Sequence, residues 1–596
     1  MVNVKNLFGM AVMATALVGC ASNDDLTPNG NENESNKVGT AYASFTIELP
    51  STRGTRTAGD PVYNPGDANE YAVNNAQLVI FKKNEATTEG EYQWVENVEI
   101  GNLEPWNNDT GEGVTRYANI TAALNSAKVS GANEYFALII LNNAGESKVA
   151  LPSSGDTYSS WNIATKAKSA ADFLKNDNGF YMANAPKYVS TTAEPTTLVS
   201  INGIYRTKEE AQNHPATTVY VERGMAKVTV ANNGFTSTPV KHGTVYENDN
   251  YEITGWALDV LNKHTFPVHM TTGLMNGGVI KAIVPSATPG VLEDGSQTLT
   301  SYANIWKNEL NKTDRFVGTG EFKRVYWGID PNYSLGLGDV DKCKEHFYIV
   351  NPAGTQYSDG TPLNWSASTT PLYCLENTFD LNNMKQGQTT RVIFKAVYTP
   401  NGIAKGKNFY KIGINNTIWS EDNLIKQIKA KAQEVLKESD ATKITVNLAA
   451  TSNDISGEAG TKWLEADNIN YTGGTVSPAD INNINNKLGL NKTNGVGIAT
   501  YKSGESYYIA RIKHFNDLTK WKAGDPTYGT NNDQYLGRYG VLRNNWYELT
   551  VNSVSGPGYP DVPEIKPDTP DDEDTKYINV SVKILDWAKR SQTVDL

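Results

Sequence analysis

Residues that build disulfide frameworks and metal sites are scarce in this sequence. Its 596 residues include six histidines and only three cysteines, which are Cys20, Cys343 and Cys374. Three cysteines exclude a disulfide framework, although Cys343 and Cys374 leave open either one bridge or two buried thiols. The histidines lack the spacing of zinc ligands, so we expect no metal site.

Motifs of enzyme chemistry are missing as well. The sequence has no Gly-x-Ser-x-Gly elbow and no phosphate loop, and Gly336 and Gly338 lack the third glycine of a dinucleotide fingerprint. The acidic run at residues 571–574 lacks the ligand alternation of a calcium loop, so we interpret it as solvated surface. The sequence therefore predicts neither an enzyme nor a cofactor.

Positive charge is in deficit. The 53 Lys and Arg residues stand against 65 Asp and Glu residues, which gives a net charge of −12. No stripe of Lys and Arg interrupts this balance, so we exclude nucleic acid as a partner. The acidity itself indicates solubility.

The only long apolar run lies at the N-terminus and resembles an export signal. Lys5 precedes an apolar run from Leu7 to Val18, which is too short to span a bilayer and suits a signal-peptide core. The run leads into Leu-Val-Gly-Cys at residues 17–20, the pattern in which the cysteine takes a lipid. We expect a lipoprotein signal peptide at residues 1–19 and lipidation of Cys20. An ordinary secretory peptide that contains a cysteine is the alternative.

What is abundant favours a mainly β fold. The chain has 50 Gly and 25 Pro, its apolar runs are short and β-branched, and 31 Tyr and 12 Trp indicate substantial cores. The length suits two to four domains, and we expect an N-terminal domain at residues 57–248 and a C-terminal domain at 249–554. Expected strands lie at Gln77–Phe81, Tyr135–Leu141, Thr217–Val230, Thr389–Tyr398, Ser506–Phe515 and Trp546–Val554. Helices are expected near Lys166–Lys175 and after Ser420, which is a suitable N-cap.

Two strands with a single apolar face lie near opposite ends of the chain. The first alternates polar residues with Ala43, Phe45, Ile47 and Leu49. A loop rich in small residues follows at residues 51–61 and contains Arg53 and Arg56. Exposed loops of this composition are where proteases cut.

The second strand has the same pattern, with Ile578, Val580, Val582 and Ile584 on one face. Residues 555–576 precede it with five prolines and the acidic run, and we predict an extended, self-repelling linker there. The strand at 577–596 either fills a groove in a neighbouring copy of the chain or folds back onto its own C-terminal domain.

Several short motifs occur in a fixed order and carry a family resemblance. Together with Cys20 and the arginine loop, they resemble the Mfa-type (minor-fimbrium) fimbrilins of the Bacteroidales, whereas residues 255–370 match no pattern of that family. The motifs are Val221–Val228, Tyr373–Thr378, Tyr507–Phe515, Gly537–Tyr547 and Val582–Trp587.

The resemblance implies a surface fimbria built from this chain. It implies two transthyretin-like β-sandwich domains with helical inserts, and export to the outer membrane as a lipoprotein. It also implies cleavage by an Arg-specific surface protease, which we expect after Arg56 or, alternatively, Arg53, so that residues 20–56 form a propeptide containing the first strand. The strand at 577–596, including Trp587, then replaces the lost strand in the next subunit.

The expected partners are therefore other subunits in a head-to-tail homopolymer, the protease, the membrane before cleavage, and a host or bacterial receptor in adhesion or biofilm formation. Two alternatives stay open. One is a tip or anchor fimbrilin that caps the filament. The other is a surface glycan-binding or hydrolytic lipoprotein, for which the many aromatic residues are the only indication.

Overall fold

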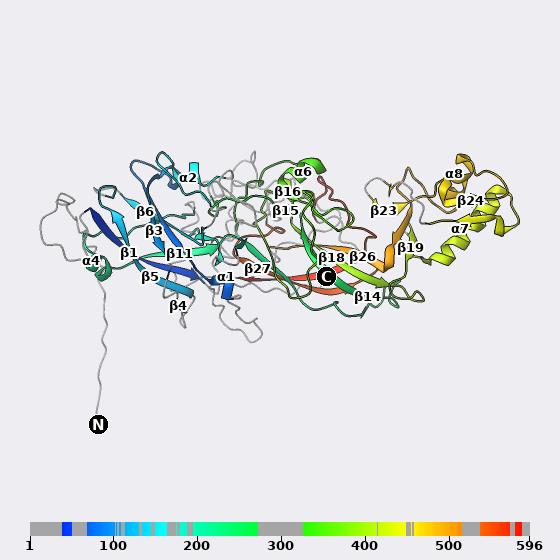
Figure 1. Cartoon of the computed structure of the whole chain (residues 1–596), viewed down its shortest axis with the longest axis horizontal. Coiled ribbons are helices and arrows are strands. Elements are labelled where there is room, and N and C mark those ends of the chain that lie inside the picture. Colours follow the sequence, from blue (N-terminus) through cyan, green and yellow to red (C-terminus); the bar gives the residue numbers. More distant parts are fainter. Residues whose placement is uncertain are drawn as a thin grey trace, which may run out of the picture.

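The computed structural model arranges the chain as three sections in a row along its long axis (Figure 1). The first is a large curved sheet, the second is a pair of facing sheets, and the third is a smaller unit of sheet and helices. The structure describes residues 39–50, 68–101, 103, 107–108, 114–129, 134–144, 149–163, 174–175, 179–187, 195–271, 325, 327–413, 415–448, 454–455, 458–514, 537–571 and 578–586.

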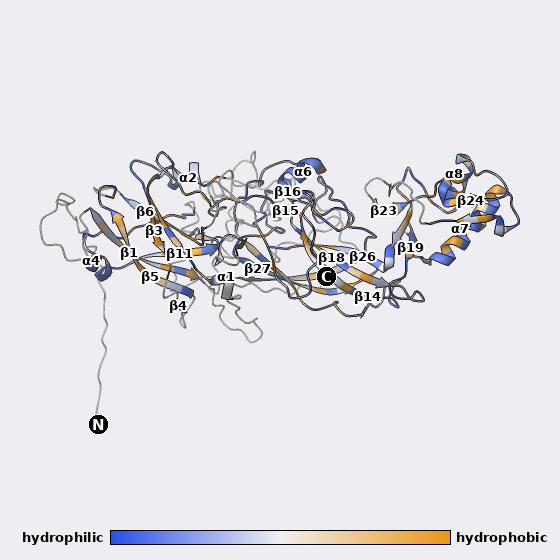
Figure 2. Ribbon diagram, viewed as in Figure 1, coloured by the Kyte–Doolittle hydropathy of each residue, from blue (hydrophilic) through white to orange (hydrophobic). Residues whose placement is uncertain are grey.

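The first sheet has nine strands in the order β3-β2-β6-β9-β11-β1-β5-β4, with β10 pairing β6. One face is lined by aliphatic side chains that form a single core, including Phe45, Leu78 and Ile139. Figure 2 shows this as hydrophobic colour along β1, β6 and β11. The strands are β1 (Thr40–Pro50), β2 (Ala76–Lys82), β3 (Gln93–Gly101), β4 (Asn107–Asn108), β5 (Val114–Asn125), β6 (Tyr135–Leu141), β9 (Met182–Asn184), β10 (Val199–Ser200) and β11 (Thr217–Arg223).

The middle section, called the sandwich below, consists of two four-stranded sheets in the orders β17-β12-β27-β28 and β13-β14-β18-β26. Both sheets contribute to one core, in which Val228 and Leu549 from one sheet meet Phe394 and Tyr508 from the other. The strands are β12 (Ala226–Val230), β13 (Thr238–Pro239), β14 (Asn250–Asp259), β17 (Leu372–Cys374), β18 (Arg391–Thr399), β26 (Glu505–Arg511), β27 (Asn545–Val554) and β28 (Ile578–Asp586).

The third section, called the tip section below, comprises residues 400–504 between β18 and β26. Its five-stranded sheet has the order β20-β19-β25-β23-β22, and helices α7 and α8 close its own core. The side chain of Ser420 caps α7 by accepting from the amide of Asn423, and Leu424 and Ile428 are fully buried, as the stripe predicts. Its elements are β19 (Phe409–Ile412), β20 (Ile418–Ser420), α7 (Glu421–Leu436), β21 (Ile444–Val446), β22 (Asp454–Ile455), β23 (Glu458–Lys462), β24 (Ile469–Tyr471), α8 (Pro478–Lys487) and β25 (Ile498–Tyr501).

Short elements complete the described chain. Three small two-stranded pairs are β7 with β8, β15 with β16, and β21 with β24. No helix among the described residues is long and apolar enough to cross a membrane. The short elements are α1 (Ala68–Tyr71), α2 (Tyr158–Trp161), β7 (Leu174–Lys175), β8 (Gly179–Phe180), α4 (Lys208–Asn213), β15 (Leu261–Asn262), α6 (Val340–His346) and β16 (Phe347–Tyr348).

Residues 555–571 form a packed strap across the sandwich, so the prediction of an extended linker is wrong for this part. Val562 and Ile565 are buried in hydrophobic clusters. Asp571 is also buried, and its Oδ1 accepts from Arg511 Nε at 2.9 Å. The interpretation of the acidic run as solvated surface is therefore wrong at Asp571, because a distant arginine balances its charge; residues 572–574 lie outside the described part.

The structure changes the bounds of several expected strands, helices and domains. The strand expected at Thr217–Val230 is two strands, β11 and β12, which lie in different sheets. Residues 226–230, which the sequence places in the N-terminal domain, pair in parallel with β27 of the sandwich. The helix expected near Lys166–Lys175 falls mostly outside the described residues, and Leu174–Lys175 is a strand. Cys343 and Cys374 are two free, buried thiols.

Candidate functional site

The first candidate site is the slot that β1 occupies in the first sheet. β1 lies between two neighbours, antiparallel to β5 on one side and parallel to β11 on the other. Its register with β5 runs without interruption from Thr40 opposite Asn125 to Leu49 opposite Arg116. The expected strand is therefore confirmed, and it is an internal strand of the sheet.

The alternating pattern of β1 sets which side chains enter the core. Ala43, Phe45, Ile47 and Leu49 have no exposed surface and belong to the core of the first sheet. The intervening side chains are half-buried and polar: the hydroxyl groups of Ser44 and Thr121 lie 3.1 Å apart. One face of β1 is thus embedded in the core, as its period of two requires.

The slot would be a strong acceptor for another strand if β1 were absent. Its removal would leave the facing backbone edges of β5 and β11 without their ladder partners and would open the core where Phe45, Ile47 and Leu49 sit. Unpaired strand edges beside an apolar groove are templates for strand addition. The chain after β1, with Arg53 and Arg56, and the segment with Cys20 lie outside the described residues.

The second candidate site is β28, which the structure pairs with β27 of the same chain. The register sets Ile578 opposite Val554, Val582 opposite Leu549 and Ile584 opposite Tyr547, all on an antiparallel ladder. β28 is the end strand of its sheet and therefore has one neighbour, whereas β1 has two. Val580 is half-buried against the sandwich core, and Trp587 lies outside the described residues.

Three of the motifs behind the family resemblance meet at a buried junction between the first sheet and the sandwich. Lys227 Nζ lies 2.6 Å from Glu70 Oε1 and 4.0 Å from the centre of the Trp546 ring. The Tyr373 hydroxyl donates to the same Glu70 oxygen, and Arg223 Nη1 donates to Asn544 Oδ1 at 3.2 Å. Residues that are more than 300 positions apart thus share one polar cluster.

A second buried ion pair lies in the same region. Arg543 Nη2 and Glu376 Oε1 are 2.5 Å apart, and both side chains are almost completely buried. Burial opposes ionisation of Glu376, but the charges of Arg543 and His269 and the hydrogen bonds from Arg543 and Thr265 together outweigh it and hold the pKa of this carboxyl below its usual value. Because a buried ion pair demands close geometry, the junction fixes how the two sections meet.

Sequence reasoning missed this junction and the strap. Glu70, Lys227 and Asp571 are charged residues whose burial no local sequence pattern predicts. Only their distant partners, Trp546 and Arg511, explain their burial. Among the described residues, no group of three or more His, Cys, Asp or Glu side chains forms a metal site.

The described chain is mainly β, and it has an internal N-terminal strand and an edge C-terminal strand. Residues 499–593 match the family "Major fimbrial subunit protein type IV, Fimbrillin, C-terminal". The match spans β26, the strap, β27 and β28. This part of the chain is similar to the C-terminal domain of the fimbrillins, a family described as major fimbrial subunits.

Fimbrillins are structural subunits and not enzymes, which agrees with the sequence prediction. No curated protein matches the sequence. Solved structures that are similar include a cell adhesion candidate from Parabacteroides distasonis (10% identity, 92% of this chain and 99% of that chain, TM-score 0.34). Another is a cell adhesion candidate from Bacteroides eggerthii (11%, 92% and 98%, 0.32), and a third is a fimbrial assembly protein from P. distasonis (12%, 38% and 65%, 0.21). At TM-scores below 0.5 these likenesses establish neither fold nor function.

Proposed function

We propose that this chain is the shaft subunit of an Mfa-type fimbria and that it polymerises head to tail by strand exchange. In this proposal the precursor is lipidated at Cys20 and cleaved after Arg56 or, alternatively, Arg53, which releases β1. The C-terminal strand of the next subunit then enters the vacated slot. The first sheet and the sandwich correspond to the two transthyretin-like domains of the family.

The observation that carries the proposal is the position of β1. An internal strand, bonded on both sides and buried along its whole apolar face, is followed directly by the segment with two arginines. Cleavage in that segment would leave β1 attached to the body only by its ladders and its core contacts. Burial of Phe45, Ile47 and Leu49 is worth about 1.5–3 kcal/mol for each side chain, so an empty slot would gain strongly from a replacement.

The C-terminal strand suits this slot in pattern and in length. β1 has 11 residues and β28 has 9, and both alternate apolar and polar residues. Because β28 is an edge strand, its departure breaks one ladder and leaves no gap inside a sheet. A strand that leaves one subunit to fill the slot of the next forms a heterologous contact, and such contacts generate filaments.

N-terminal sequencing of subunits from isolated filaments tests the cleavage step. We expect the sequence to begin at Thr57, or at Gly54 if Arg53 is the site. Filament subunits that begin at Cys20 would overturn the proposal. Metabolic labelling with a fatty-acid analogue should mark the wild-type precursor and not the Cys20→Ser variant.

A truncation tests the donor strand. Removal of residues 577–596 keeps the strap, which the sandwich requires, and should give a folded, secreted and cleaved monomer that forms no filaments. Val582→Asp should have the same effect, whereas Ser581→Asp, on the polar alternation, should assemble. Filaments from the truncated chain would refute strand donation, and an unfolded product would show that β28 is needed in its own sandwich.

A further inference from the structure

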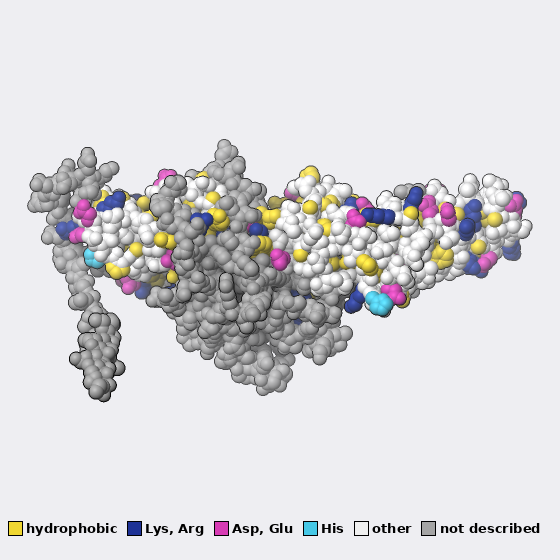
Figure 3. Space-filling view, turned by 90° about the horizontal axis from the view of Figure 1, so that it is seen from below, with side chains coloured by type: hydrophobic (Ala, Val, Ile, Leu, Met, Phe, Trp, Pro, Cys, Tyr) yellow, Lys and Arg dark blue, Asp and Glu magenta, His cyan; other side chains and the backbone are white. Residues whose placement is uncertain are grey.

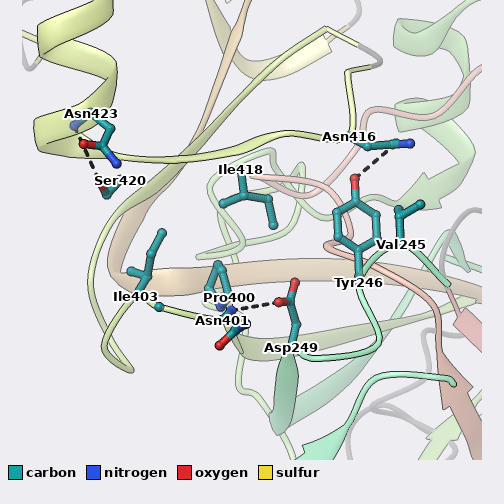
Figure 4. A pocket seen from close by; sticks show the side chains of 11 residues that line it. Val245, Tyr246, Asp249, Pro400, Asn401, Ile403, Asn416, Ile418, Ser420 and Asn423 are labelled. Carbon is teal, nitrogen blue, oxygen red and sulfur yellow. Dashed lines mark hydrogen bonds between the residues drawn. The ribbon is translucent and has the colours of Figure 1, made fainter.

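An open pocket lies where the tip section joins the sandwich (Figure 4). Three parts of the chain form it: the loop before β14, the loop after β18, and the start of the tip section up to α7. Its volume is about 390 Å³, which lies in the range of roughly 300–1,000 Å³ typical of small-molecule sites. Its size therefore suits a ligand of one or two rings.

Hydrogen bonds within the protein fix the position of two polar side chains in the pocket. Asp249, which is buried, accepts at Oδ1 from the Asn401 amide and at Oδ2 from the Tyr398 hydroxyl, each at 2.7 Å. The Tyr246 hydroxyl donates to Asn416 Oδ1 at 3.3 Å and accepts from Lys411 Nζ at 2.9 Å. These bonds fix the carboxylate and the aromatic ring before any ligand arrives.

Other polar groups of the pocket are left available for a ligand. Within the described residues, no hydrogen bond engages the side-chain amides of Asn401 and Asn423, although both residues line the pocket. Each amide offers two donors and one acceptor oxygen, and a carboxylate such as Asp249 has room for more than two donors. The pocket can thus form several hydrogen bonds with hydroxyl groups, which both donate and accept.

A smaller part of the pocket lining is apolar. Ile403, Ile418 and the ring of Tyr246 lie between the polar groups, as Figure 4 shows. Val245, at the rim, is 71% exposed, whereas the two other exposed large hydrophobic residues of the described chain are 36% and 38% exposed. On the face shown in Figure 3, hydrophobic side chains otherwise lie in small separate spots. Figure 4 shows Val245 beside Tyr246 and Asn416, so the pocket ends in an exposed aliphatic side chain on that side.

We propose that this pocket binds a neutral saccharide. A sugar ring presents hydroxyl groups at its edge and C–H groups on its faces, which matches amides and a carboxylate alternating with aliphatic and aromatic surface. Among the described residues that line the pocket there is no Lys or Arg, which disfavours phosphorylated or acidic ligands. The site is independent of the strand-exchange mechanism, since its nearest residue, Val245, is 195 residues from the end of β1 in sequence and the pocket lies in the opposite half of the molecule (Figure 1).

Saturation-transfer NMR on the monomeric full-length chain tests the proposal. The probes are the methyl glycosides of glucose, galactose, mannose, fucose, N-acetylglucosamine and N-acetylgalactosamine, with sialic acid and glucose 6-phosphate as charged comparisons. We expect at least one neutral glycoside to give a saturable signal. Stronger binding of the two charged sugars than of every neutral one, or no signal from any neutral glycoside, would overturn the assignment.

Variants locate the binding. The Asn401→Ala and Asn416→Ala changes remove exposed side chains, so both proteins should fold, and each should weaken binding about two- to tenfold through the loss of a hydrogen bond. Asn482→Ala, an exposed asparagine on α8 of the same section, is the matched control and should bind as the wild type does. Unchanged affinity in the double variant Asn401→Ala/Asn416→Ala would show that the sugar binds elsewhere. A failure of filament assembly would leave these outcomes untouched, because the measurement uses monomers.

Discussion

Replacement of Phe45 by alanine should destabilise the precursor and leave the filament unchanged. Phe45 is fully buried in the middle of β1, opposite Ile120 of β5 and Thr217 of β11. Truncation of a buried Phe to Ala typically costs about 3–5 kcal/mol. If β1 is absent from assembled subunits, the filament no longer contains residue 45, and the substitution cannot change the stability of the filament.

Hydrogen exchange of the neighbouring strands measures both effects. In the uncleaved precursor, 3–5 kcal/mol corresponds to a loss of protection in β5 and β11 of about a hundred- to several-thousand-fold. In filaments, protection of the same strands should equal that of the wild type. The control is Ser44→Ala, which removes one half-buried hydroxyl contact and should cost only about 0.5–1.5 kcal/mol in the precursor.

Two results would refute this reasoning. Equal loss of protection in precursor and filament would mean that β1 stays in the assembled subunit. No loss in the precursor would mean that Phe45 does not hold the first sheet together. If the alanine variant fails to fold, Phe45→Leu is a milder change of about 1 kcal/mol that keeps the comparison possible.

Three further predictions concern the body of the protein. Asp571→Asn leaves a buried arginine without its counter-charge and should lower the free energy of unfolding by about 3–5 kcal/mol, whereas Asp568→Asn, in an exposed pair, should change it little; urea unfolding measures both. Burial raises the pKa of Cys343 to about 11 and that of Cys374 to about 12, so neither thiol should react with iodoacetamide at pH 8 until the chain unfolds, and native alkylation detected by mass spectrometry would contradict this. Burial also raises the pKa of Asp330 to about 7, so the folded state binds the proton more tightly than the unfolded state; stability should fall as the pH rises from about 4 to 7, and Asp330→Asn should flatten that part of the thermal-stability profile.

The sequence pattern alone predicts those strands and helices that have one apolar face. The alternation at Ala41–Leu49 predicts β1 to within one residue at each end, and the stripe after Ser420 predicts α7. These elements are specified by periodicity, which is a property of the segment itself. The same alternation predicts the strand at β28, and the structure has strands at both segments. Their exchange between subunits stays a prediction.

Position within a sheet depends on partners that the sequence does not place. The segment 217–230 divides between two sheets at residues 222–225, and the short interruption by Glu222, Arg223 and Gly224 does not show that β11 and β12 find different partners. The sequence predicts an extended linker in place of the strap because it contains five prolines and four acidic residues. The structure differs because Asp571 pairs with Arg511, which is sixty residues away in the sequence. The pocket under the tip section likewise joins loops more than 150 residues apart. Such long-range pairings carry no local period, and so pattern reasoning cannot find them.

The slot of β1 also affects how a filament would resist tension. Ladder hydrogen bonds lie across the strands, so tension along a strand loads all of them together, as in shear. β1 has eleven register pairs with β5 and four with β11, whereas a strand at the edge position of β28 is held from one side only. A filament joined through this slot would carry a pull through both ladders at once, and its lifetime under load would depend on one cooperative rupture instead of a series of small ones.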